Sequence, residues 1–122
     1  MKKLFYLLAA VAVVAFVGCD KDDSKNGGLA GTTWVWSDSD SWGWERETIS
    51  FQKNGKVTLL YEEEFQGEYD SYEYTGTYSY NEPNVTLTLS NYGEQHTLTG
   101  TVSGNQLRLY EDGDYYETYT RK

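Results

Sequence analysis

The chain has 122 residues, which is enough for one folded domain, and it carries a formal net charge of −9. This acidic balance excludes a nucleic-acid-binding surface, since contacts to phosphate need clustered Lys and Arg, and it disfavours an anionic lipid surface for the same reason. With 12 Tyr and 4 Trp, the composition is that of a tyrosine-rich globular domain.

The first residues have the parts of an export signal. Lys2 and Lys3 form a positively charged start, and residues 4–17 are an apolar run within the roughly 7–15 residues typical of signal peptides. A membrane-spanning helix would need about 20 apolar residues. Residues 1–18 are therefore predicted to be a signal peptide.

The only cysteine of the chain follows this run. The segment Val17-Gly18-Cys19 resembles the lipobox of bacterial lipoproteins. In that family the cysteine thiol is alkylated with diacylglycerol, the leader is cut before the cysteine, and the new amino group is acylated. The resemblance implies that Cys19 is the first residue of the mature chain and its membrane anchor, since several acyl chains bind a membrane stably. The alternative is a structural cysteine after an ordinary secretion signal.

The residues after the cysteine suggest a destination. Asp20, Lys21, Asp22 and Asp23 resemble the export signal of Bacteroidetes surface lipoproteins. That resemblance implies a location on the outer face of the outer membrane. The other interpretation is an acidic, solvated linker.

Alternation of apolar and polar residues dominates residues 29–122, and no 3.6-residue pattern appears. Residues 19–28 before it are predicted to be the lipidated cysteine and a flexible acidic tether. Asn54-Gly55, between two alternating runs, predicts a tight hairpin because both positions tolerate positive φ. The domain is therefore predicted to be all-β. Strands are expected over residues 32–37, 46–51, 56–62, 71–81, 85–90, 96–103, 106–110 and 115–120.

Two glycines interrupt the alternation at matching places. Gly76 and Gly100 each lie on the apolar face within a Thr-Gly-Thr segment, and a glycine in mid-strand marks a bend or a close approach of a neighbouring backbone. The short connections favour an up-and-down meander, and eight strands can close into an antiparallel barrel without exposed edges. A two-sheet β-sandwich is the alternative.

Four segments of the domain also resemble a known family. They are "LAGTTWVW", "ISFQKNGKVTLL", "GTYSYNEPNVTLTL" and "YETYTRK", and they are similar to the small lipocalin-like domains of Bacteroidetes lipoproteins. The resemblance implies a calycin-like β-barrel. The spacing from Gly31 to Trp34 is one residue longer than the lipocalin Gly-X-Trp, and no C-terminal helix follows, so a lipocalin ligand cavity is not carried over.

Few residues could support catalysis. His96 is the only histidine, and no second histidine or free cysteine is present to complete a metal site or a dyad, so packing or a place at the barrel rim is favoured. Residues 38–43 begin like a calcium loop, but Trp42 fills the fifth position and Ile49 the twelfth, where a bidentate Glu is needed. The glutamates at 62–64 are expected to be a solvated strand end. No catalytic residue, metal or cofactor is predicted, and the chain is not expected to be an enzyme.

Aromatic residues are the candidates for a binding site. Trp34 and Trp36 are in phase with the predicted core. Trp42 and Trp44 lie in a polar segment, residues 37–46, expected to be a loop where they stack on sugar rings or contact a partner protein. The alternative is a lid folded over the barrel mouth. A row of tyrosines has the same two readings, ligand contact or filling of a small barrel interior. The row comprises Tyr72, Tyr74, Tyr78 and Tyr80.

Together these features predict a lipoprotein of the cell envelope, on the surface of the outer membrane, attached through acyl chains on Cys19. Its β-domain is predicted to be a non-enzymatic binding module for a glycan or a small apolar ligand. The alternative is a structural or protein-interaction lipoprotein, such as an inhibitor or accessory subunit, with a filled barrel and no small-molecule ligand.

Overall fold

The computed structural model describes residues 28–122. The predicted signal peptide, Cys19 and the predicted export signal at residues 20–23 lie outside the described residues. Within the described part of the chain, no helix is long and apolar enough to cross a membrane.

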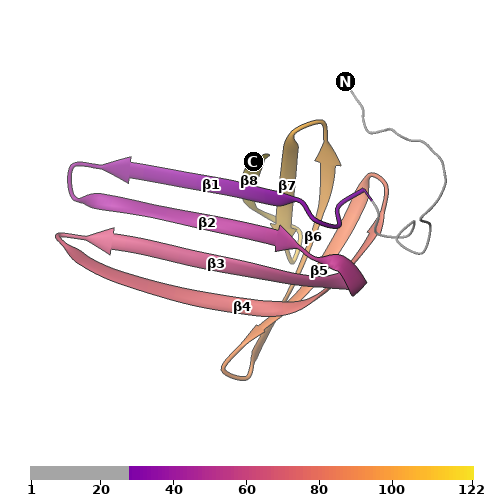
Figure 1. The fold of residues 1–122 in the computed structure, drawn as a ribbon, viewed down its shortest axis with the longest axis horizontal. Coiled ribbons are helices and arrows are strands. Elements are labelled where there is room, and N and C mark those ends of the chain that lie inside the picture. The colour runs from indigo at the N-terminus through magenta and orange to yellow at the C-terminus, as the bar shows by residue number, and fades with distance from the viewer. Residues whose placement is uncertain (1–27) are drawn as a thin grey trace.

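The domain is a closed antiparallel barrel in which each strand pairs with the next and the last pairs with the first (Figure 1). This confirms the all-β, eight-stranded, up-and-down barrel, and the β-sandwich alternative is wrong. The strands are β1 (Thr33–Asp40), β2 (Gly43–Phe51), β3 (Lys56–Phe65), β4 (Glu68–Asn81), β5 (Asn84–Asn91), β6 (Glu94–Ser103), β7 (Gln106–Glu111) and β8 (Asp114–Arg121), with a short 3-10 turn, η2 (Lys53–Gly55), between β2 and β3.

The turns confirm the local chemistry expected at Asn54-Gly55. Both residues have positive φ, 69° and 75°, as a tight reversal of the chain requires. The connection is longer than a two-residue hairpin, because the Gln52 N–H donates to the Lys56 carbonyl oxygen at 2.8 Å around η2. Paired positive φ values recur at Gln66-Gly67, Tyr92-Gly93 and Asp112-Gly113.

One end of the barrel is closed by its own core. Leu29 is buried there, and the Thr32 hydroxyl donates to the Leu29 carbonyl oxygen at 2.6 Å while accepting from Trp34 Nε1 at 2.9 Å. The Lys122 N–H donates to the Thr33 carbonyl oxygen at 2.8 Å, so the C-terminus lies at this same end. The buried apolar side chains are Leu29, Trp34, Ile49, Phe51, Val57, Leu59, Tyr78, Val85, Leu87, Leu89, Leu98, Leu107, Leu109 and Tyr119.

The mid-strand glycines allow close contact between neighbouring backbones. A methyl group at Gly76 would lie 1.7 Å from the Thr88 carbonyl oxygen, and one at Gly100 would lie 2.1 Å from the Arg108 carbonyl oxygen. Both distances are shorter than any real carbon–oxygen contact. The expectation of close backbone approach at both glycines is thus confirmed.

The first four strands extend past the barrel. β1 pairs with β8 only at Trp34 and Val35, and β4 pairs with β5 only from Thr75 onward. Beyond these points, residues 36–47 and 61–74 form a four-stranded sheet that projects away from β5–β8, to the left in Figure 1. We call it the distal sheet. One of its faces continues the barrel interior.

The expected loop at residues 37–46 is wrong. β1 continues to Asp40 and β2 starts at Gly43, so this segment is a hairpin of the distal sheet. Asp40 Oδ1 accepts hydrogen bonds from the backbone N–H groups of Trp42, at 2.8 Å, and Gly43, at 3.1 Å, which closes the turn. These strand ends were not predicted because their residues are mostly polar on both faces and so show no alternation of apolar and polar residues.

Candidate ligand-binding site

A pocket of about 330 Å³ lies in the open mouth of the barrel, where the distal sheet projects. Side chains from every strand from β2 to β8 line it, so it sits on the barrel axis. Its apolar wall is Leu59, Leu89 and Leu98, its tyrosines are Tyr61, Tyr72, Tyr74 and Tyr116, and its ionisable groups are Glu47, His96 and Glu111.

Glu47 is a buried carboxylate in this pocket, with 8% of its surface exposed. The Tyr119 hydroxyl donates to its Oε1 at 2.5 Å, and the Tyr116 hydroxyl donates to its Oε2 at 3.1 Å. Burial raises the pKa of Glu47 above its ordinary value, the two tyrosine hydrogen bonds oppose that rise, and the nearby carboxylates of Glu117 and Glu45 add to it. Among residues 28–122, no lysine or arginine forms an ion pair with Glu47.

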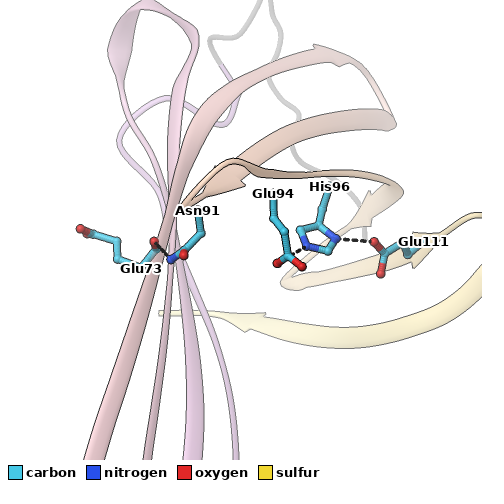
Figure 2. Close-up of polar contacts among 5 residues, drawn as sticks. All are labelled: Glu73, Asn91, Glu94, His96 and Glu111. Atoms are coloured by element: carbon cyan, nitrogen blue, oxygen red, sulfur yellow. Dashed lines mark hydrogen bonds and ion pairs between the residues drawn. The ribbon is translucent and has the colours of Figure 1, made fainter.

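His96 lies at the rim of the pocket between two glutamates, as Figure 2 shows. Its Nδ1 is 2.9 Å from Glu111 Oε2, and its Nε2 is 3.6 Å from Glu94 Oε1. The hydrogen bond to Glu111 is the main cause that raises the pKa of His96. The Tyr74 and His96 rings meet in a T-shaped arrangement, with centroids 5.8 Å apart and planes at 77°. The rim position expected for His96 is thus observed.

A side-chain contact fixes the mouth where β4 and β5 separate. Asn91 Nδ2 donates to the Glu73 carbonyl oxygen at 2.6 Å (Figure 2). This bond continues the β4–β5 contact past the last residue pair of the ladder. It holds the β4 strand, and with it Tyr72 and Tyr74, against the mouth.

Two tyrosines form the wall on the side of the distal sheet. The Tyr61 and Tyr72 rings are stacked, with centroids 6.1 Å apart and planes at 20°. The Tyr61 hydroxyl lies 2.9 Å from Glu63 Oε1 and 3.0 Å from Glu45 Oε1. Because a hydroxyl has one proton, the two carboxylates share a single donor. Burial and these two glutamates raise the pKa of Tyr61.

The inner face of the distal sheet is acidic beyond the tyrosines. Strand register aligns one carboxylate from each strand in a row, in the order Asp38, Glu45, Glu63 and Asp70. Directly opposed side chains in a sheet lie about 4.5–5.5 Å apart at their Cβ atoms, so like charges here repel. The distal sheet has one basic residue, Arg46, which the alternation of side chains places on the outer face.

On the outer face of the distal sheet, the one basic residue is paired with a glutamate. Arg46 pairs with Glu62 at 3.0 Å, and its guanidinium lies 5.1 Å from the centroid of the Trp44 ring. The Tyr69 hydroxyl donates to Glu62 at 2.8 Å, and the Tyr69 and Trp44 rings are 6.2 Å apart. Trp44 therefore packs on the face opposite to the pocket. Trp42 lies in the β1–β2 turn and is 60% exposed.

The structure separates the predicted aromatic candidates. Tyr72 and Tyr74 line the pocket, whereas Trp42 and Trp44 do not. Tyr78 is buried at the closed end, where its ring meets Phe51 edge-on with centroids 4.7 Å apart. Tyr80 also packs against the core rather than lining the pocket.

Sequence reasoning did not single out the residues that the other strands contribute to the pocket. Tyr116 and Glu111 come from β8 and β7, far along the chain from the tyrosine row. The sequence does contain one sign of the pocket at Glu47, which lies on the same face of β2 as the apolar residues Ile49 and Phe51. A charged residue on the core face of a strand is the pattern that marks such a site.

Residues 28–122 contain no group of three or more His, Cys, Asp or Glu side chains placed to hold a metal ion. The eight-stranded closed barrel is compatible with a lipocalin-like domain. Comparisons with protein-family models, with curated proteins and with solved structures find no match for this chain.

Proposed function

We propose that the chain is a non-enzymatic binding protein whose barrel holds a small ligand in its open mouth. The observation that carries this proposal is the pocket of about 330 Å³ on the barrel axis. Its size is at the lower end of the roughly 300–1,000 Å³ common for small-molecule sites. Like such sites, it has mainly apolar and aromatic walls and few polar groups.

Of the two ligand classes expected from the sequence, the pocket favours the small, largely apolar one. Leu59, Leu89 and Leu98 supply walls that desolvate an apolar group. A glycan that stacks on an exposed ring would instead use Trp42, which is exposed in the β1–β2 turn and does not line this pocket. The two ligand classes therefore require different residues.

Ligand recovery tests the proposal. The full-length sequence is expressed, the protein is purified in a nonionic detergent, and the bound small molecules are extracted and identified by mass spectrometry. We expect a ligand that the Tyr72→Ala variant loses and the Trp42→Ala variant keeps. The opposite pattern indicates glycan binding at the turn. A protein that carries no ligand and takes up none from an envelope extract would contradict the proposal.

We further propose that this protein is a lipoprotein of the cell envelope, as the resemblance of Val17-Gly18-Cys19 to a lipobox implies. Metabolic labelling with an alkynyl fatty acid tests this part. The wild-type chain should be labelled and fractionate with membranes, and the Cys19→Ala variant should lose both properties while keeping its β-sheet circular dichroism. An unlabelled wild type contradicts the anchor.

The surface location rests on the resemblance of residues 20–23 to a Bacteroidetes export signal. In a Bacteroidetes host, an external protease added to intact cells should digest the wild-type chain. Replacing Asp22 and Asp23 with Ala should protect it, because the chain then stays on the inner leaflet of the outer membrane. Equal digestion of both proteins contradicts this role of the segment.

One observation favours the protein-interaction alternative. Past Val35, β1 pairs with no strand on its β8 side among residues 28–122, so the segment to Asp40 is an open sheet edge that an added strand can pair with. A photo-crosslinker at Ser39 on this edge should capture a defined partner, whereas one at Thr99, on the fully paired β6, should not. Equal crosslinking at both positions, or none at either, would count against this function.

A further inference from the structure

The pocket holds a buried carboxylate that has no positive partner among residues 28–122. Glu47 is 8% exposed, and its hydrogen-bond donors are the neutral hydroxyls of Tyr116 and Tyr119. Burying a carboxylate costs free energy unless a counter-charge or sufficient hydrogen bonding offsets it, and buried charges in proteins are therefore usually paired. No lysine or arginine of the described chain supplies that pair.

We propose that the pocket binds a compact organic cation, whose ammonium group lies against Glu47 within the tyrosine walls. This inference rests on the proposed ligand-binding function and names the chemical class of the ligand. The ligand's positive charge would complete the ion pair that Glu47 lacks.

The aromatic walls suit a cation as well as an apolar group. The faces of tyrosine rings carry partial negative charge, and a cation within about 6 Å of a ring centroid is attracted to it. Tyr61, Tyr72, Tyr74 and Tyr116 surround the same cavity as Glu47. Several rings around one carboxylate form the type of cage that binds quaternary ammonium groups.

The remaining charges at the mouth also favour a cation. Glu111 and Glu94 flank His96, so even a protonated imidazole faces two carboxylates. The acidic row from Asp38 to Asp70 lies on the approach to the mouth, and no basic residue shares its face. A field of one sign along an approach raises the local concentration of oppositely charged ligands. An anionic ligand, such as a fatty acid, would meet only repulsion from these carboxylates.

Isothermal titration of the full chain, purified in nonionic detergent, tests the charge requirement directly. The cationic probes are choline, tetramethylammonium and butylammonium. The neutral probe is the carbon isostere of choline, in which a tert-butyl group replaces the trimethylammonium group, and the anionic probe is butyrate. We expect choline to bind at least about tenfold more tightly than its isostere, a difference typical of one charge-assisted contact. Butyrate should not bind.

Two matched variants place the effect at Glu47. Glu47→Gln keeps the shape and removes the charge, so choline affinity should fall at least about tenfold while the affinity of the neutral isostere changes little. Glu64→Gln removes the same charge from the outer face of the distal sheet and should leave choline affinity within about twofold. The comparison of probes on the wild type needs no variant, so it stands even where Glu47→Gln perturbs folding.

The possible results distinguish a failure of the cation proposal from a failure of the proposed ligand-binding function. The inference is overturned if no cationic probe binds more tightly than the neutral isostere, or if butyrate binds best. It is also overturned if the two Gln variants weaken choline equally, since net charge would then be the cause. The proposed function survives each of these results when the ligand recovered from the wild-type protein is neutral or anionic and is lost in Tyr72→Ala.

Discussion

Replacing Gly76 with Ala is expected to destabilise the barrel strongly. The added methyl carbon would lie 1.7 Å from the Thr88 carbonyl oxygen and 2.8 Å from the Thr88 carbonyl carbon, both part of the β5 backbone. A tolerable carbon–oxygen contact needs about 3 Å or more, so β4 and β5 must separate by at least about 1 Å. No side-chain rotation can relieve a clash between a Cβ atom and a backbone.

The cost follows from what that separation breaks. Moving the strands apart by about 1 Å takes the nearest N–H···O=C bonds beyond hydrogen-bonding range. Losing two such bonds costs about 1 kcal/mol each, and disturbed packing of the buried Leu87 and Leu89 adds a similar amount. The total is about 3–4 kcal/mol, out of the roughly 5–15 kcal/mol by which a domain of this kind is stable.

Gly113→Ala is the matched control. Gly113 has φ +85° in the β7–β8 turn, and nothing lies within 4 Å of an added methyl group. The left-handed conformation alone costs about 1–2 kcal/mol, and the effect of the change on the unfolded chain is the same at both sites. Urea unfolding followed by tryptophan fluorescence, with Trp34 buried in the core, measures both variants. If Gly76→Ala costs no more than Gly113→Ala, the close approach of β4 and β5 is not the reason for this glycine.

Three further changes test the site and the closed end. Burial raises the pKa of Glu47, so the stability of the wild type should fall as the pH rises from the ordinary glutamate range through that raised pKa. Glutamine does not titrate, so the stability of Glu47→Gln relative to the wild type should increase with pH. A stability difference that urea titrations show to be independent of pH contradicts this. Glu111→Gln should lower the pKa of His96, because its hydrogen bond is the main cause of the rise, and an NMR titration with an unchanged midpoint would disprove this. Trp34→Phe removes the indole donor to Thr32 and should lower the free energy of unfolding by about 1–3 kcal/mol. A urea midpoint equal to that of the wild type contradicts this.

The sequence was sufficient for the barrel because its strands have one buried face and its turns have distinctive residues. Asn54-Gly55 marked the first hairpin between core strands, and Gly76 and Gly100 marked the points where backbones nearly touch. The distal hairpin at residues 37–46 lacked both signals, since its tip is exposed on both faces and its turn is closed by the Asp40 side chain. Alternation of apolar and polar residues arises because one face of a strand is buried, so a strand that buries neither face cannot be recognised by this pattern.

The pocket was only half predictable for a related reason. Tyr72 and Tyr78 share a face of β4, but they are six positions apart, which corresponds to about 20 Å along the strand. One tyrosine therefore lines the mouth and the other fills the closed end. Strand phase gives the face that a side chain occupies, whereas its height in the barrel depends on how neighbouring strands are staggered.

The position of the first described residues bears on how such a protein meets its ligand. An added Cβ at Gly28 would lie 3.1 Å from the Tyr80 ring, at the closed end where β4 turns into β5, and the pocket opens at the other end. If the chain is anchored at Cys19, as we propose, the anchor joins the barrel at its closed end. The anchored end and the pocket that contains Glu47 would then lie at opposite ends of the domain.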